Sequence, residues 1–232
     1  MLVKLKTDVV VISLGGSLIC PDGLDVPFLK KFRALIEDFP EKKFSIVCGG
    51  GKLARNYASG ASEITAVSEK DLDWIGIRAT HLHAEVVRSL FDDFAYPEII
   101  VNPTKKLRTK KMILVAGGWK PGWSTDMDAV LLAKNIGAKL VINLSNIDHV
   151  YDKDPRKYKD AKKIVEISWD AFLRYIVGEK WKPGMNTPFD PVASREAKKA
   201  GMDVIVTDGR DIENLRHILE KAAFFKGTVI HG

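Results

Sequence analysis

Short runs of β-branched and aliphatic residues alternate along the chain with longer segments in which apolar residues recur every three or four positions. Within the runs, consecutive positions are apolar, which is typical of strands buried on both faces. Such strands, separated by amphipathic helices, form a mainly parallel sheet that helices cover on both sides. The predicted strands are 8–14, 44–48, 98–101, 112–116, 139–144 and 203–207.

Amphipathic helices are expected between these strands. Asp126 and Ser168 precede or begin two of them and can accept hydrogen bonds from free backbone N–H groups, so each is predicted to cap its helix. Gly137 and Gly201 stand where a left-handed residue ends a helix. The predicted helices are 26–38, 52–61, 71–93, 126–136, 168–178, 190–200 and 211–223.

The chain has 232 residues, 46% of them hydrophobic and 28% charged, which indicates a globular protein and excludes a disordered or fibrous chain. Because neither an internal repeat nor a Pro/Ser-rich linker divides it, we expect a single domain over 1–232. The apolar runs are far shorter than the roughly 20 residues of a membrane-spanning helix, so no membrane partner is expected. The N-terminal stretch does not resemble a secretory signal, which favours the cytoplasm.

The net charge of +6 suits anionic ligands in general. The basic run 105–111 lacks interleaved aromatic residues and is interpreted as a solvated loop, so we expect no nucleic-acid partner. Cys20 and Cys48 lack the grouping of a disulfide framework or a zinc site. His81 and His83 lie two positions apart on a predicted helix and face different ways, which favours structural roles.

Three predicted strands run directly into glycine clusters, at 15–16, 49–51 and 117–118. Glycine permits positive φ and close approach of a ligand, and free N–H groups before a helix bind anions. One cluster alone could equally be a tight strand-to-helix turn. Three on one sheet indicate a site for several phosphates, although the fingerprints of P-loop and dinucleotide-binding folds are both missing.

These clusters belong to longer motifs, which are Ser13-Leu-Gly-Gly-Ser17, Gly49-Gly-Gly-Lys-Leu-Ala-Arg55, Asp73-Trp-Ile-Gly-Ile77, 117–126, 146–155 and Lys182-Pro-Gly184. In this order they resemble the amino acid kinase superfamily, and within it the archaeal-type uridylate (UMP) kinases. The resemblance covers nearly the whole chain. It implies an α/β/α sandwich around a mainly parallel sheet, with the phosphate acceptor over the N-terminal half and ATP over the C-terminal half.

The reaction implied by the resemblance is transfer of the ATP γ-phosphate to UMP, with Mg²⁺ arriving on ATP, in a homo-oligomer that is usually a hexamer in the family. The residues implied around ATP are Gly16, Ser17, Gly51, Arg55, Ser145, Asn146, Tyr151 and Asp154. Those implied around UMP are Gly50, Asp73, Trp119, Lys120, Pro121, Gly122, Trp123, Ser124 and Thr125. The implied catalytic residues are Lys52, Lys182, Asp190 and Asp126.

Other interpretations of several of these residues stay open. Arg55 and Lys182 could be solvent-exposed cations, and Asp73 could be a helix cap. The acidic residues between 148 and 154 could attract a metal ion. Because the glycine and the closing glutamate of a calcium loop are missing, we expect no dedicated metal site.

Three residues depart from the family pattern. Ser13 replaces a lysine that many superfamily members direct at the transferring phosphate, which leaves more of the electrostatic stabilisation to Lys52 or Lys182. Trp123 stands where UMP kinases usually have histidine, and His149 replaces a usual glycine. Two alternatives therefore remain, a superfamily kinase for a different small phosphate or carboxylate acceptor and a non-catalytic nucleotide-binding assembly.

Overall fold

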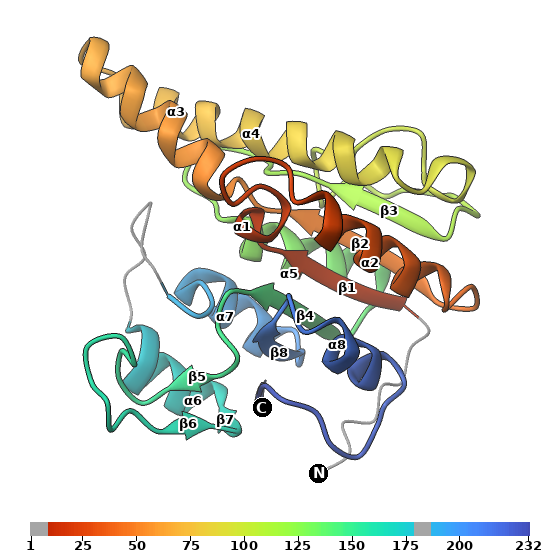
Figure 1. Cartoon of the computed structure of the whole chain (residues 1–232), viewed down its shortest axis with the longest axis vertical. Coiled ribbons are helices and arrows are strands. Elements are labelled where there is room, and N and C mark those ends of the chain that lie inside the picture. Colours follow the sequence, from red (N-terminus) through yellow and green to blue (C-terminus); the bar gives the residue numbers. More distant parts are fainter. Residues whose placement is uncertain (1–8, 179–186) are drawn as a thin grey trace.

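The computed structural model of the chain describes residues 9–178 and 187–232. Its centre is a sheet with the spatial order β3-β2-β1-β4-β8-β9-β7 (Figure 1). The strands of this sheet are β1 Val9–Leu14, β2 Lys43–Cys48, β3 Ile113–Ala116, β4 Leu140–Ser145, β7 Glu166–Ser168, β8 Asp203–Asp208 and β9 Thr228–His231. A separate hairpin pairs β5 Val150–Tyr151 with β6 Lys163–Ile164.

Strands β3, β2, β1, β4 and β8 are mutually parallel, so their carboxyl ends lie along one edge of the sheet. β9 pairs antiparallel with β8 and parallel with β7. The prediction of a mainly parallel sheet is confirmed. The short strands β5, β6, β7 and β9 are additional to the six predicted ones.

The predicted strand 98–101 is wrong. Ile100 makes only an isolated bridge to Ala116 beside the edge strand β3, and Ala95 makes another to Ile113. Pro97 and Pro103 flank the segment, and proline has no N–H group to donate to a ladder. The segment therefore follows the edge of the sheet without becoming a strand.

The seven predicted helical segments are all present, with shifted ends. The helices are α1 Gly16–Ile19, α2 Val26–Glu37, α3 Gly51–Ile64, α4 Glu69–Ser89, α5 Thr125–Ile136, α6 Trp169–Ala171, α7 Pro191–Lys199 and α8 Ile212–Leu219. α1 was not predicted. A 3-10 turn Asp92–Phe94 follows α4, and α6 continues as a π-helical turn Phe172–Val177.

The predicted helix caps can be compared with the helix ends in the structure. Asp126 does not cap α5, because the Ser124 hydroxyl accepts from the Met127 N–H at 3.2 Å and the helix begins one residue before Asp126. Ser168 does cap α6 through the Ala171 N–H, at 3.3 Å. Gly137 (φ 78°) and Gly201 (φ 57°) follow α5 and α7 in the left-handed conformation, as predicted.

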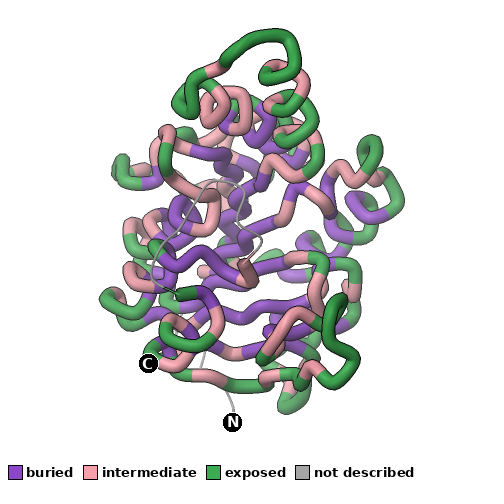
Figure 2. Tube along the Cα trace, turned by 90° about the vertical axis from the view of Figure 1, so that its left-hand side faces the viewer, coloured by how far each residue is buried: buried purple, intermediate pink, exposed green. Residues whose placement is uncertain are grey.

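Each face of the sheet has its own hydrophobic core. Val10 and Ile12 of β1 pack on the side of α2, α8 and part of α4, whereas Val11 packs on the side of α5 and α7. Buried residues accordingly run through the middle of the trace, and exposed ones lie at loops and helix ends (Figure 2). The predicted α/β/α sandwich is confirmed. In the described ranges, no helix is long and apolar enough to cross a membrane.

Candidate active site

The first two glycine clusters lie against each other at the carboxyl ends of β1 and β2. A Cβ atom on Gly16 would lie 2.4 Å from both the Gly49 carbonyl oxygen and the Gly51 nitrogen. Gly51 has a φ of +58°, and its own Cβ would meet the Gly16 carbonyl carbon at 2.4 Å. These glycines are therefore required for contact between the two loops, in addition to any approach of a ligand.

Helix α4 holds two of the glycine loops through side chains that the sequence did not single out for this role. The Thr80 hydroxyl accepts from the Gly118 N–H at 2.7 Å, and His81 Nε2 donates to the Gly118 carbonyl at 2.8 Å. His83 Nδ1 donates to the Gly49 carbonyl at 2.7 Å. The two histidines face different loops, in agreement with their predicted structural roles.

Asp73, predicted to contact UMP, lies in α4 and accepts from the Gly122 N–H at 2.7 Å. The alternative of a helix cap is wrong for Asp73, because Ser68 caps α4 by accepting from the Asp71 N–H. Gly122 has a φ of +80°, which suits the sharp turn of the loop. We call the segment 117–125 the acceptor loop. Asp73 thus anchors the acceptor loop to α4.

Two tryptophans and a lysine of the acceptor loop form one cluster. Trp119 and Trp123 meet edge to face, with ring centroids 5.5 Å apart. Lys120 Nζ lies 4.1 Å from the centroid of Trp119 and 4.4 Å from that of Trp123. This cation–π arrangement holds the ammonium group over the rings. The lysine therefore stiffens a loop that is otherwise rich in glycine.

Asp126 lies where the acceptor loop meets the centre of the sheet. Its carboxylate accepts from the Ser13 hydroxyl at 3.2 Å and from the Asp190 N–H at 3.1 Å. Asp190 caps α7 by accepting from the Ala193 N–H at 2.7 Å. Burial and then the nearby Asp190 charge raise the pKa of Asp126 to about 7, and burial also raises the pKa of Asp190.

Asp128 is a buried carboxyl group beneath the acceptor loop. Its Oδ2 accepts from the Trp119 N–H at 3.1 Å, whereas its Oδ1 has no hydrogen-bond partner among the described residues. Burial raises the pKa of Asp128 to about 7. The sequence analysis missed this residue, although an aspartate on the apolar side of a predicted helix is a signal that could have found it.

The predicted cations differ in their surroundings. The Lys52 ammonium forms an ion pair with Asp22, so its charge is already compensated. Arg55 is exposed in α3 and forms no ion pair with a described residue, which leaves its guanidinium available to a phosphate. Lys182 lies outside the described residues.

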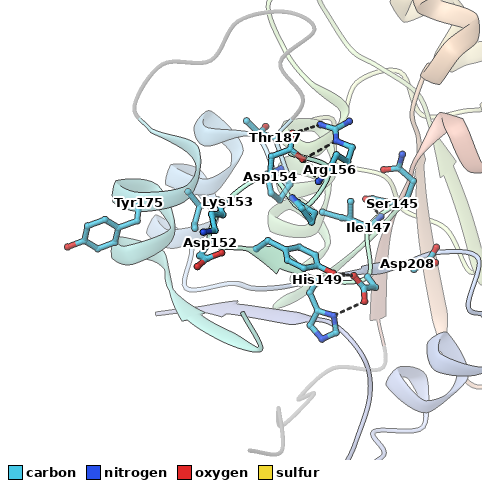
Figure 3. Close-up of a pocket in the computed structure, with 16 residues that line it drawn as sticks. Ser145, Ile147, His149, Asp152, Lys153, Asp154, Arg156, Tyr175, Thr187 and Asp208 are labelled. Atoms are coloured by element: carbon cyan, nitrogen blue, oxygen red, sulfur yellow. Dashed lines mark hydrogen bonds and ion pairs between the residues drawn. The ribbon is translucent and has the colours of Figure 1, made fainter. Parts of the chain in front are cut away.

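A cavity of about 730 Å³ opens beyond the carboxyl end of β4 (Figure 3). It brings together the four residues predicted for ATP in the C-terminal half, Ser145, Asn146, Tyr151 and Asp154. Asp208 also lines it, because the last residue of β8 pairs in register with Ser145. We call this space the donor cavity. Sequence reasoning did not name Asp208, Thr187 or Pro188 as lining residues.

Two carboxylates in the donor cavity are held by cations. Asp154 accepts from Nε and Nη2 of Arg156, each at 3.0 Å, and these bonds lower the pKa of Asp154. Burial acts to raise the pKa of Asp148, but hydrogen bonds from Lys163 and Tyr151 hold it at about 2. Among residues 9–178 and 187–232, no group of three or more His, Cys, Asp or Glu residues could hold a metal ion.

His149 connects the donor cavity to the end of the sheet. It is buried, and its Nε2 accepts from the Gly227 N–H at 3.2 Å. Its Nδ1 lies 3.3 Å from Asp148 Oδ2. A glycine at this position could make neither contact. The imidazole therefore fixes the cavity wall to the residue before β9.

Comparisons with known proteins show the family to which the chain belongs. The model of the amino acid kinase family matches residues 8–208. The chain belongs to the amino acid kinase family. It is 35% identical to a uridylate kinase of Methanospirillum hungatei over 224 residues, 95% of this chain and 94% of that protein.

Two further relatives support this assignment to the amino acid kinase family. A uridylate kinase of Thermoplasma volcanium is 37% identical over 213 residues, 91% of this chain and 92% of that protein. The crystal structure of uridylate kinase from Archaeoglobus fulgidus aligns with a TM-score of 0.82 at 32% identity, covering 95% of this chain and 99% of that one. A UMP kinase structure from Bacillus anthracis, at 18% identity and a TM-score of 0.77, shares the fold.

In this amino acid kinase, the contact between Asp126 and Asp190 joins the acceptor loop to the wall of the donor cavity. Asp126 directly follows the acceptor loop, and Asp190 lies two residues after Pro188, which lines the donor cavity. The Asn143 side chain in the central strand β4 donates to the Pro188 carbonyl at 2.9 Å. The loop, the carboxylate pair and the cavity wall are therefore one connected hydrogen-bonded unit.

Proposed function

We propose that this protein transfers the γ-phosphate of ATP to UMP, giving UDP and ADP. The observation that supports this most strongly is the match, over nearly the full length of both chains, to relatives named uridylate kinase. The donor cavity and the acceptor loop lie at the same edge of the sheet, as a direct transfer requires.

In the proposed reaction, a phosphate oxygen of UMP attacks the γ-phosphorus of ATP. The bond from that phosphorus to the β-bridging oxygen breaks, and ADP leaves. Because the second pKa of a phosphate monoester is about 6, UMP is already the nucleophile near neutral pH and no residue has to remove a proton. The chain must align the two substrates and neutralise charge.

The acceptor loop, Gly50 and Asp73 are proposed to hold UMP. The backbone donors of Gly16, Ser17 and Gly51, with Arg55, are proposed to face the ATP phosphates, and the donor cavity takes adenine and ribose. MgATP is the proposed form of the donor. The positive charge that neutralises the moving phosphoryl group would come from that Mg²⁺ and from Lys52 and Lys182. Lys52 must leave its ion pair with Asp22 before it can bind the phosphoryl group.

Asp126 and Asp190 place two carboxyl groups at the proposed transfer point. Two full negative charges there would repel the phosphates. Because burial raises the pKa of Asp126 to about 7, part of its population is protonated near neutral pH and the repulsion is reduced. We propose that Asp126 orients the transfer site through Ser13 and the Asp190 N–H, rather than acting as a base.

One assay separates this function from its alternatives. ADP release from MgATP is measured with UMP, CMP, AMP, GMP, carbamate, glutamate and isopentenyl phosphate. Turnover with UMP alone supports the proposal. Turnover with a different acceptor favours the related kinase, which the cluster of Trp119, Lys120 and Trp123 motivates. Tight ATP binding without turnover of any acceptor favours a non-catalytic assembly.

We also propose a cytoplasmic homo-oligomer, a hexamer by resemblance, built from a single domain over 1–232. α3 has no buried residue, and its Tyr57 and Ile64 are exposed, which suits contact with another copy. Light scattering of the purified chain measures the subunit count, and a monomer at micromolar concentration would contradict this part of the proposal. Limited proteolysis that yields two stable halves would contradict a single domain.

A further inference from the structure

A second cavity, of about 310 Å³, lies at the opposite edge of the sheet from the glycine loops. Val9 and Lys43 are the first residues of β1 and β2, and Met112 directly precedes β3, so the cavity lies at the amino ends of these parallel strands. The loop 106–111 forms its rim. We call this space the basic cavity. Neither the donor nor the acceptor region contributes to it.

Cations surround the basic cavity without carboxylate partners. Lys43, Lys106, Arg108 and Lys111 line it, and within the described part of the chain no aspartate or glutamate does. Among the described residues, none of the four forms an ion pair. Lys111 alone is engaged, by the main-chain carbonyl of Asp93. Four like charges gathered around one cavity attract anions.

The loop at the rim is fixed to the body of the protein. Asn135, in the last turn of α5, donates to the carbonyls of Pro103 and Lys105, both at 2.9 Å. The Thr109 hydroxyl accepts from the Lys111 N–H at 3.1 Å. The loop therefore presents its cations from an anchored backbone.

Part of the lining is apolar. Leu107, Met112, Leu114 and Ile136 also line the cavity. A volume of this size is at the small end of ligand sites, which run from about 300 to 1,000 Å³. The combination suits a compact anion with several negative charges, with room for part of an attached apolar ring.

We propose that the basic cavity binds a small polyphosphate anion, free or as the phosphate chain of a nucleotide, at a site separate from the donor and acceptor sites. A nucleic acid fits less well, because strand binding uses exposed aromatic platforms and Phe44, the aromatic residue of the lining, is buried. The inference does not depend on the proposed function.

The test compares three full-length chains. The first is the wild type, and the second is the double variant Lys43→Ala with Arg108→Ala, which removes two cations from the basic cavity. The third is the matched control Lys30→Ala with Lys31→Ala, which removes two exposed cations of α2. Hydrogen exchange, read by mass spectrometry, reports binding separately in segments 104–112 and 145–156, so the donor cavity provides an internal comparison.

Tripolyphosphate is expected to slow exchange in 104–112 of the wild type and of the control. In the cavity variant the concentration required is expected to rise about tenfold or more, since each charge-assisted hydrogen bond contributes about 1.5–3 kcal/mol. UTP and ATP form the nucleotide arm. If a nucleotide protects 104–112 at a lower concentration than tripolyphosphate does, the cavity is a nucleotide site. If the concentrations are equal, the cavity binds the phosphate chain itself.

Three outcomes would overturn the inference. The first is that none of the three probes protects 104–112 at millimolar concentration. The second is that the control variant needs as large an increase in probe concentration as the cavity variant. The third is that only an RNA oligonucleotide protects 104–112. The cavity variant is expected to keep its turnover with MgATP and UMP, because none of its changes touches the proposed active site. If the wild type itself shows no turnover with MgATP and UMP, that result counts against the proposed function and not against the basic cavity.

Discussion

The backbone N–H of Asp190 donates to the Asp126 carboxylate across 64 positions of sequence, at 3.1 Å. This bond joins the start of α5, after the acceptor loop, to the start of α7, beside the donor cavity. The Ser13 hydroxyl fixes the other carboxylate oxygen from the end of β1. A carboxyl group that holds three segments together has an orienting role that substitution can test.

Replacing Asp126 with alanine removes both of these contacts at once. We expect kcat to fall by roughly 10²–10³, the cost typical of a lost preorganising group, while the KM for ATP changes little. Steady-state kinetics with UMP and MgATP measure both quantities. Asp126→Asn is the conservative companion variant and should recover part of the rate, because its amide oxygen still accepts one bond. Unchanged kcat in the alanine variant would contradict the orienting role.

Asp73→Ala removes the acceptor of the Gly122 N–H and frees the acceptor loop. We expect the KM for UMP to rise about tenfold, since a hydrogen bond to a charged group contributes about 1.5–3 kcal/mol, while the KM for ATP stays near its wild-type value. Glu69→Gln, an exposed carboxylate in the same helix, is the control. Equal increases for both substrates would indicate general damage to the fold instead.

Asp128→Asn keeps an acceptor for the Trp119 N–H and removes the buried charge. The folded-state pKa of Asp128 is about 7, above its ordinary value of 3.8, so the folded state binds the proton more tightly. The stability contributed by the protonated group is present below pH 4 and is lost as the pH rises to about 7. At pH 8 the variant should be more stable than the wild type, by an amount on the order of 2–4 kcal/mol.

Urea unfolding of Asp128→Asn at pH 4 and pH 8 measures this difference, with Asp93→Asn as the exposed control. The wild type should lose stability between these two pH values more steeply than the variant. An equal decline in the wild type and in Asp128→Asn would show that Asp128 has the same pKa in the folded and unfolded states.

Gly16→Ala tests the contact between the first two glycine loops. Its Cβ would lie 2.4 Å from main-chain atoms that cannot move independently, so we expect loss of both stability and turnover. Gly60→Ala is the matched control in α3, where nothing lies within 4 Å, and it should stabilise the protein by about 0.5–1 kcal/mol. Thermal unfolding and the kinase assay measure the pair. If Gly16→Ala and Gly60→Ala both kept wild-type stability and turnover, the contact between the first two glycine loops would not require glycine at position 16.

The candidate site was predictable in part. The glycine loops were found because they directly follow predicted strands, which is a local property of the sequence. Ser145, Asn146, Tyr151 and Asp154 were named through the resemblance to the family. The capping prediction for Asp126 was wrong because Ser124 competes for the same N–H groups, while Asp126 is used in a contact with a distant segment. His81, His83 and Thr80 gave no local signal, since their partners lie more than thirty positions away.

The sequence by itself determined the layered α/β architecture, because consecutive apolar positions leave a strand no stable place except between two helical layers. Only the tertiary structure decided that Ile100 remains outside the ladder and that α4 holds two glycine loops. It also decided that Asp128 is buried with one oxygen that has no partner among the described residues. Hydrophobic periodicity is set by near neighbours in the chain. Hydrogen bonds between loops, and the pKa changes that follow burial, depend on which distant segments the fold brings together.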